Sequence, residues 1–205
     1  IVDSIQPNAR GTFAVQPPNP VYGLGSGNRI FEFLSVAKTF DYQIDWAPDD
    51  VSRLWRYNLH YFDFLRESSR TRDDKVQLIR EWIRDNPQGS QPGWEPFTTS
   101  RRIVNWIFFF ADVPDAAANE VLESLHTQVR WLERNDERHI LANHYFENLK
   151  ALVFAGTYFE GSDAERWRET AVPELIAQFR EQTLADGGHY ERSPQYHLPL
   201  QHLRR

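Results

Sequence analysis

The sequence predicts a mainly α-helical fold of stacked antiparallel helical hairpins, preceded by a short irregular lead-in. Three observations support this fold class. Apolar residues recur at helical spacing from about residue 51 onward. The helical stretches are joined mostly by short turns, and helices joined in this way pack antiparallel. Proline and glycine punctuate residues 1–30, which favours irregular structure there, and no repeat of fixed length is visible, which disfavours a regular solenoid.

The predicted domain organisation is a lead-in over residues 1–50 and a helical domain over residues 51–205. In the lead-in, Phe31 and Phe33 alternate with polar neighbours, which predicts one or two short strands in a hairpin. The chain has no methionine, even at position 1, and its last helical pattern stops short. We therefore expect the chain to be part of a longer protein.

Periodicity and end signals predict seven successive helices after the lead-in. They cover "VSRLWRYNLHYFDFLRES", "RDDKVQLIREWIRDN", "TSRRIVNWIFFFAD", "DAAANEVLESLHTQVRWLERN", residues 143–159, "SDAERWRETAVPELIAQFREQTL" and "SPQYHLPLQHL". Thr99 or Ser100 is expected to cap the third helix, and Ser162 or Asp163 the sixth. Pro173 is expected to kink the sixth helix because it removes a backbone donor.

Composition excludes several classes of function. The net charge is −6 and no basic patch extends along the chain, so nucleic acid is not expected as a partner. The absence of cysteine excludes disulfides, thiolate metal sites and a cysteine nucleophile. The most apolar run, "NWIFFFADV", is far shorter than the ~18 residues of a membrane span. Seven tryptophans suit either sugar stacking or core packing.

A first group of candidate site residues stands at the start of the predicted fifth helix. Asn143 is a natural N-cap there, but capping does not account for His144 and Glu147 beside it. Asn143 and Glu147 are four residues apart, share a helix face and can converge on one ligand. The free N–H groups and positive dipole of a helix N-terminus favour a carboxylate or a sulfate.

A second group lies in "DGGHYERSPQYH", residues 186–197. The two glycines predict a sharp turn, and Ser193-Pro194 predicts a helix start that holds Tyr196 in its first turn. The surrounding polar and aromatic side chains are too dense to be explained by packing alone: His189, Tyr190, Glu191, Arg192 and His197.

Other chemistries find weaker support in the residues. No HExxH or similar ligand spacing accompanies the histidines, so neither a metal site nor another cofactor is expected in this segment. The G-x-S-x-G elbow of a serine hydrolase is absent. A glycosidase needs two carboxylates across a cleft, for which Glu147, Glu191 and Asp186 are candidates whose pairing stays open.

Four stretches of the chain resemble the N-terminal domain of the heparinase II/III-like polysaccharide lyases. They are "WRYNLHYFDFL", "EPFTTSRRIVNWI", "NHYFENLKALVFAGTYF" and "DGGHYERSPQYH", in matching order and spacing over about residues 30–205. One departure is "TTS" before Arg101, where a Pro-Ile or Val-Ser pattern is expected. The resemblance implies an incomplete (α/α) toroid, a C-terminal antiparallel β-sandwich that is absent from this chain, and a periplasmic or secreted bacterial protein.

The resemblance also implies an activity, namely β-elimination of an acidic, uronic-acid-containing polysaccharide. By position, Asn143 corresponds to the residue that neutralises the uronate carboxylate, and Tyr196 to the general base and acid. A histidine of the β-sandwich completes the centre. Substrate contacts are expected from further residues: His144, Glu147, Arg102, Trp106, His189, Arg192 and His60.

The chemistry of elimination explains why such groups are needed. Removing the C5 proton builds negative charge on the uronate carboxylate, which a nearby amide and helix N-terminus can stabilise. A tyrosine can take that proton and return one to the leaving oxygen, provided that cations lower its pKa. Two other functions stay open: a helical-toroid glycoside hydrolase, and a non-catalytic module for carbohydrate binding or exopolysaccharide assembly.

Overall fold

The computed structural model describes residues 29–138 and 143–182. These ranges hold a two-stranded sheet, six α-helices and two short 3₁₀ helices, so the mainly helical prediction is confirmed. The elements are β1 (Arg29–Phe33), β2 (Val36–Phe40), α1 (Arg53–Tyr61), η1 (Asp63–Arg66), α2 (Arg72–Asp85), α3 (Pro96–Asp112), η2 (Pro114–Ala116), α4 (Asn119–Arg134), α5 (Asn143–Tyr158) and α6 (Ser162–Gln182). The seventh predicted helix lies outside the described residues, and closure into a toroid stays a prediction.

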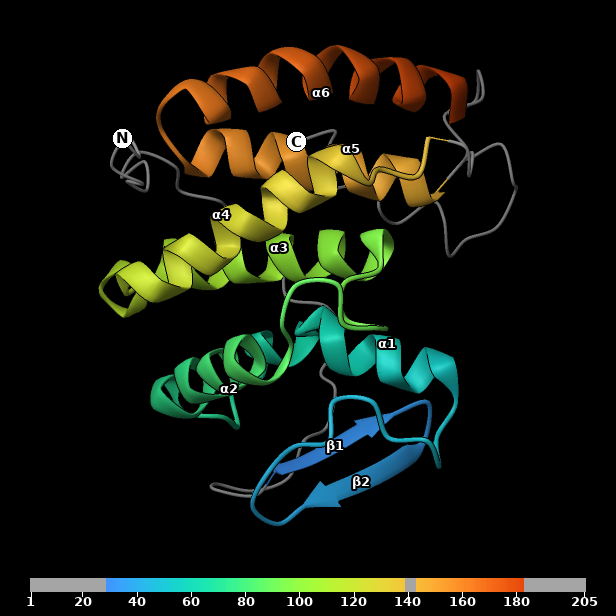
Figure 1. Cartoon of the computed structure of the whole chain (residues 1–205), viewed down its shortest axis with the longest axis vertical. Helices are drawn as coiled ribbons and strands as arrows, with labels where there is room; N and C mark the ends of the chain where they lie inside the picture. The colour runs from blue at the N-terminus through green and yellow to red at the C-terminus, as the bar shows by residue number, and fades with distance from the viewer. Residues whose placement is uncertain (1–28, 139–142, 183–205) are drawn as a thin grey trace.

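The elements form a layered stack (Figure 1). From top to bottom it runs through α6, α5, α4 with α3, then α1 with α2, and finally the hairpin β1–β2. α3 is the central element, because it packs against α1, α4 and α5. No helix in the described ranges has both the length and the apolar character needed to cross a membrane.

The predicted hairpin is confirmed and belongs to the same core as the helices. Phe33 faces Val36 across the antiparallel pair, which leaves Leu34 and Ser35 as a two-residue turn. Both turn residues have positive φ, as the hairpin twist requires. The buried ring of Phe33 lies edge-on to Trp55 at 5.1 Å, and this contact fixes the hairpin against α1.

The prediction for the first helix, residues 51–68, is wrong in its length, because α1 ends at Tyr61. The Ser52 hydroxyl caps α1 by accepting a hydrogen bond from the Trp55 N–H, and Phe62 ends the helix with a φ of 62°. A left-handed phenylalanine is strained, but its fully buried ring is held against Trp46 and Trp106. The break starts η1 at Asp63, whose carboxylate thereby comes to face α3.

The predicted start of the third helix is also wrong. α3 begins at Pro96, so Thr99 and Ser100 lie inside the helix and are buried rather than capping it. Proline fits the first helical position because its fixed φ suits the helix and its missing N–H has no partner to lose there. The three additional residues bring Phe97 onto the helix, at the end of α3 that carries the site.

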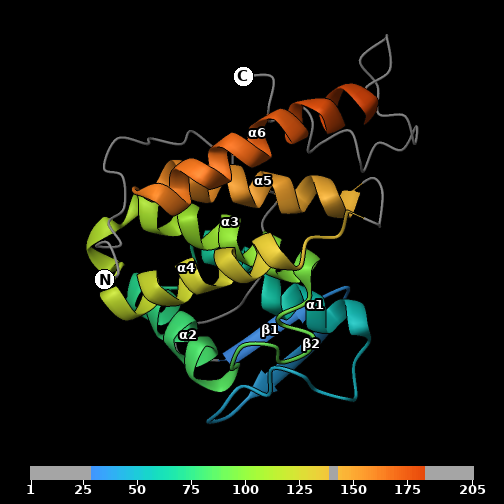
Figure 2. The same cartoon turned by 45° about the horizontal axis from the view of Figure 1, so that its top comes forward.

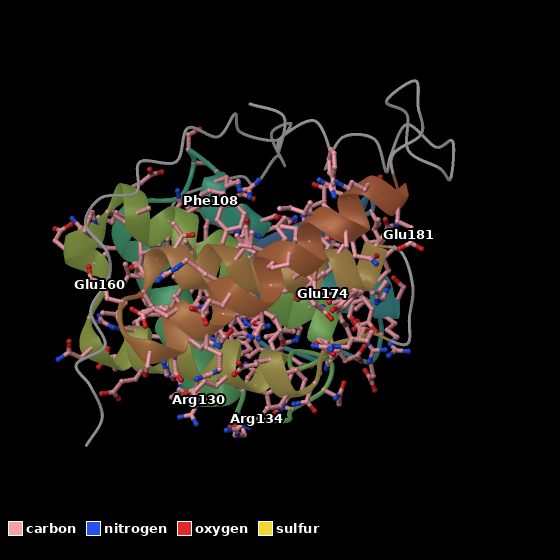
Figure 3. All side chains as sticks on the ribbon, turned by 90° about the horizontal axis from the view of Figure 1, so that it is seen from above. Phe108, Arg130, Arg134, Glu160, Glu174 and Glu181 are labelled. Carbon is pink, nitrogen blue, oxygen red and sulfur yellow. The ribbon has the colours of Figure 1, made fainter. Side chains whose placement is uncertain are left out.

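α5 and α6 run side by side as a hairpin (Figure 2). Gly156 allows their close approach, because a Cβ there would lie 2.9 Å from the Ala164 carbonyl oxygen. Gly161, with a φ of 95°, turns the chain into α6, which starts at Ser162 and includes Pro173. Seen from above, α6 is the outermost layer, with Glu174 along its length and Glu181 near its end (Figure 3).

Candidate functional site at the start of helix α5

The first turn of α5 places two of the predicted site residues at a partly exposed position. Asn143 is the first described residue of α5; it is helical and half-buried. The side chain of His144 is 44% exposed, and its Nδ1 lies 3.1 Å from Glu137 Oε1. Its ring packs on Phe97 of α3 at 4.6 Å.

A row of aromatic rings leads away from this turn. Successive ring centroids are 6.4 Å apart from Tyr57 to Tyr61, 5.9 Å from Tyr61 to Phe97, and 4.6 Å from Phe97 to His144. We call Tyr57, Tyr61, Phe97 and His144 the ring row. α1, α3 and α5 each contribute to it, so the row exists only because these helix ends meet. Tyr61 is buried, whereas Tyr57, Phe97 and His144 are partly exposed, and exposed ring faces can bind the C–H faces of sugars.

Two arginines flank the ring row, and each is paired with a carboxylate. The Arg53 guanidinium lies 5.2 Å from the Tyr57 ring centre and donates to both oxygens of Glu95 at 2.9 Å. The Arg101 guanidinium lies 5.6 Å from the Tyr61 ring centre and donates to Asp63 at 3.3 Å.

The electrostatics of this face keep its cations charged and its phenols protonated. Burial opposes the charge on Arg101, yet the carboxylates of Asp63 and Glu147 raise its pKa above the ordinary value. Burial, reinforced by Glu95, raises the pKa of Tyr57 to about 12. Burial also raises the pKa of Tyr61. Because both phenols hold their protons at neutral pH, neither suits the role of general base.

Two buried carboxylates border the first turn of α5. Glu147 is 5% exposed; its Oε1 accepts a hydrogen bond from Lys150 at 2.6 Å. Within the described part of the chain, Glu147 Oε2 and Glu137 Oε2 are buried and have no hydrogen-bond partner. Neither of these two oxygens has accessible surface, so a ligand does not reach them in this structure, and the expectation that Glu147 contacts substrate finds no support in its burial.

Asn148 fixes this end of α5 to the rest of the fold. It is fully buried; its Oδ1 accepts from the Glu137 backbone N–H and its Nδ2 donates to Ser100 Oγ, both at 2.8 Å. Asn148 therefore joins α5 to α3 and to Glu137, the residue that pairs with His144.

Asn148→Ala is expected to lower the free energy of unfolding by about 1–3 kcal/mol, because it removes two hydrogen bonds and leaves the Glu137 N–H without its acceptor, while Ser100 Oγ keeps its bond to Pro96 O. Urea titration measures this change. Asn135→Ala serves as control, since Asn135 is exposed and bonds only the Trp131 carbonyl four residues earlier. The control is expected to cost less than about 0.5 kcal/mol. Equal effects of the two substitutions would contradict the anchoring role.

Three residues expected to contact substrate lie instead in the core, and that expectation is corrected. His60, Arg102 and Trp106 have no exposed surface. His60 accepts from Trp82 Nε1 at 2.9 Å and contacts the Trp46 carbonyl at 2.7 Å, which requires the neutral ring; burial, aided by Arg102, lowers its pKa to about 3.

Arg102 is the centre of a buried polar network. It donates to Gly93 O at 2.7 Å and to Gln128 Oε1 at 2.8 Å, and its guanidinium lies 3.8 Å from the Trp82 ring centre. Burial lowers its pKa well below the ordinary value. Packing and backbone acceptors therefore explain this arginine without a ligand.

The remaining predicted site residues, His189, Arg192 and Tyr196, lie outside the described residues. Within the described ranges no cluster of three or more His, Asp or Glu side chains is arranged to hold a metal ion. The sequence analysis missed the ring row apart from His144, and also missed Arg53, Glu95 and Asp63. The only sequence signal for the row was the spacing of Tyr57 and Tyr61, which places them on one helix face.

Comparison with known proteins gives heparin-sulfate lyases and a protein named for localisation. A heparin-sulfate lyase from Pedobacter heparinus is 32% identical over 189 residues, covering 82% of this chain and 28% of the relative. FtsZ-localized protein C from Caulobacter vibrioides is 27% identical over 204 residues, covering 90% of this chain and 33% of the relative. A heparin-sulfate lyase from Bacteroides thetaiotaomicron is 25% identical over 204 residues, covering 84% and 28%.

Solved structures show the same fold. A heparinase III structure superimposes with a TM-score of 0.59 at 18% identity, covering 80% of this chain and 31% of that chain. A mutant heparan sulfate lyase from Pedobacter heparinus gives a TM-score of 0.57 at 23% identity, covering 96% and 34%. This chain thus spans about a third or less of the length of each relative.

The family model described as Heparinase II/III N-terminus matches residues 26–202, which is nearly the whole chain. The match includes the hairpin, all six described helices and the site at the start of α5. The chain therefore belongs to the Heparinase II/III N-terminus family.

Proposed function

We propose that this chain provides the helical half of a polysaccharide lyase centre that cleaves uronic-acid-containing glycans by β-elimination. Asn143 neutralises the uronate carboxylate, and Tyr196 acts as general base and acid. The observation that carries the proposal is the position of Asn143 in the first turn of α5, directly before His144 of the ring row in the sequence, in a chain of this family.

The geometry at the start of α5 supports binding of the uronate carboxylate more directly than it supports the proton transfer. An amide and the free N–H groups of a helix N-terminus stabilise the charge that develops as the C5 proton leaves. Tyr57 and Tyr61 keep their protons, so the proton transfer falls to a tyrosine elsewhere, and Tyr196 is our candidate.

The complete centre in this proposal includes a histidine from a C-terminal β-sandwich. Relatives named heparin-sulfate lyase, of which the matched region covers 28% in each case, support a larger enzyme. A periplasmic or secreted location belongs to the same proposal. The substrate is an acidic polysaccharide, and no cofactor enters the reaction as proposed.

The test is product formation by the natural protein that carries this chain, incubated with a panel of uronic-acid polysaccharides. Each elimination creates a C4–C5 double bond conjugated to the carboxylate, which is followed by its ultraviolet absorbance. Tyr196→Phe is expected to reduce this rate at least about 100-fold while polymer binding is kept. Tyr42→Phe is the control, because Tyr42 is 92% exposed and is expected to change nothing.

Two other outcomes would contradict the proposal. A glycoside hydrolase would release reducing ends without the new double bond, because water is added across the cleaved bond. A non-catalytic module would bind the polymer and release no product. This outcome is measured because one relative, FtsZ-localized protein C, has a name that denotes localisation and no enzyme activity.

A further inference from the structure

The imidazole of His144 is held by two neighbours and is open elsewhere. Its Nδ1 lies 3.1 Å from Glu137 Oε1, and its ring packs on Phe97 at a centroid distance of 4.6 Å. The side chain is nevertheless 44% exposed. Within the part of the chain that the structure describes, Nε2 of His144 makes no hydrogen bond and is not buried. The ring therefore offers Nε2 to a ligand, one residue after Asn143.

Glu137 is a mostly buried carboxylate in a fixed position. Its side chain is 12% exposed, so a ligand cannot reach most of it directly. Its backbone N–H donates to Asn148 Oδ1 at 2.8 Å, and Asn148 in turn donates to Ser100 Oγ of α3 at 2.8 Å. Since Asn148 belongs to α5, these bonds fix the carboxylate relative to both α5 and α3. Through Oε1 this fixed group contacts the exposed ring of His144.

A carboxylate at Nδ1 determines which nitrogen of the ring is free. An ionised carboxylate only accepts hydrogen bonds, so Nδ1 of His144 carries the proton of this contact. In the neutral imidazole the other nitrogen, Nε2, then keeps its lone pair and accepts a hydrogen bond. Without the carboxylate either nitrogen can carry the proton. A sugar presents hydroxyl groups, and a hydroxyl is a donor for such a lone pair.

We propose that Glu137 is a positioning residue, which orients His144 so that Nε2 accepts a hydrogen bond from a hydroxyl of the bound sugar. The inference rests on the proposed function for its substrate class, and it adds a residue that does not itself touch the substrate. Asn143 meets the carboxylate of the uronate, and His144 meets a hydroxyl. Two neighbouring residues in the first turn of α5 thus fix how the sugar lies.

The test is a double-mutant cycle on binding to the natural protein, measured as a dissociation constant by calorimetry. The probe is heparan sulfate or alginate, whichever the wild type binds more tightly. Glu137→Gln is expected to weaken binding about 3- to 10-fold, because glutamine offers a donor as well as an acceptor and no longer determines the tautomer. His144→Phe keeps a ring on Phe97 but lacks both nitrogens, and is expected to weaken binding at least as much.

The double variant separates positioning from a structural role. If Glu137 acts through His144, Glu137→Gln has no further effect on the dissociation constant once His144 is phenylalanine. A structural role for Glu137 would instead weaken binding by the same factor in both backgrounds. Thermal unfolding verifies the fold of every variant. If Glu137→Gln does not fold, Glu137→Asp replaces it, because the shorter side chain withdraws the carboxylate from Nδ1 and the same loss is expected.

Asp163→Asn is the matched control. Asp163 pairs with His126 at 3.1 Å, the same separation as in the Glu137–His144 pair. This second pair joins α4 to α6, which contribute none of the four rings. The control is expected to leave the dissociation constant unchanged.

The inference is overturned if Glu137→Gln binds the probe as tightly as the wild type, or if it weakens binding equally with and without His144. It is also overturned if the wild type binds neither probe. Failure of the lyase proposal looks different: no polymer yields an unsaturated product, while the coupling of Glu137 to His144 in binding persists.

Discussion

Arg102→Leu is expected to lower the free energy of unfolding by about 3–5 kcal/mol, which is a large share of the stability of a domain of this size. The fully buried guanidinium donates to Gly93 O and Gln128 Oε1 and stacks on Trp82. Leucine leaves Gln128 Oε1 without this donor and leaves Gly93 O with only the long bond of 3.4 Å from Thr99 Oγ1. It also removes the link between α3 and the residues that precede it.

Urea titration of wild type and variant measures this effect. Arg166→Leu is the comparison, because Arg166 makes ion pairs with Glu133 and Asp163 but is 44% exposed. Exposed pairs contribute little, so this control is expected to cost less than about 1 kcal/mol. If both variants lost the same stability, the buried network would not have the importance assigned to it. Of these two arginines only Arg166 has carboxylate partners, yet its substitution is expected to lower the stability less than that of Arg102.

Asn143→Ala is expected to reduce the rate of elimination by about 100- to 1,000-fold, the effect of removing one donor to a developing negative charge. The prediction follows from the proposed role of Asn143 and concerns the chemical step. The rate is measured by the ultraviolet absorbance of the unsaturated product at saturating polymer. Affinity for the polymer is expected to change much less, since the exposed rings of the ring row remain.

A matched control separates catalysis from helix stability. Asn119 is the first residue of α4, as Asn143 is of α5, and both substitutions remove an amide from a first helical turn. Asn119→Ala is expected to leave the elimination rate unchanged. An equal loss of rate in both variants, or an Asn143→Ala variant with wild-type rate, would refute the role proposed for Asn143.

Much of the fold could be predicted from the sequence because apolar periodicity is a local property. The hairpin around Phe33 and all six described helices follow from it. Two details depend on packing and could not be read locally. The break at Phe62 exists because Trp46 and Trp106 enclose its ring, and the early start of α3 at Pro96 was hidden by the polar appearance of "TTS".

The site was predictable only in part, for the same reason. Asn143, His144 and Glu147 are close in sequence and could be grouped from their spacing. His60 and Arg102 resemble surface or ligand-binding residues in a sequence, because the groups that satisfy them come from distant segments. For Arg102 these are Gly93 and Gln128. The ring row, assembled from three helices, was likewise invisible before the fold was known.

Arg101 and Arg102 are neighbours on α3 with opposite surroundings, one beside Tyr61 at the site and the other enclosed with Trp82 in the core. Adding or deleting one residue in the first turn of α3, before Arg101, would rotate the rest of the helix by about 100°. Both guanidinium groups would then point away from their partners. Redesign of this face is therefore limited to exchanging side chains. Changes in loop length are better made in segments that do not determine which side chains of α3 face the core and which face the site.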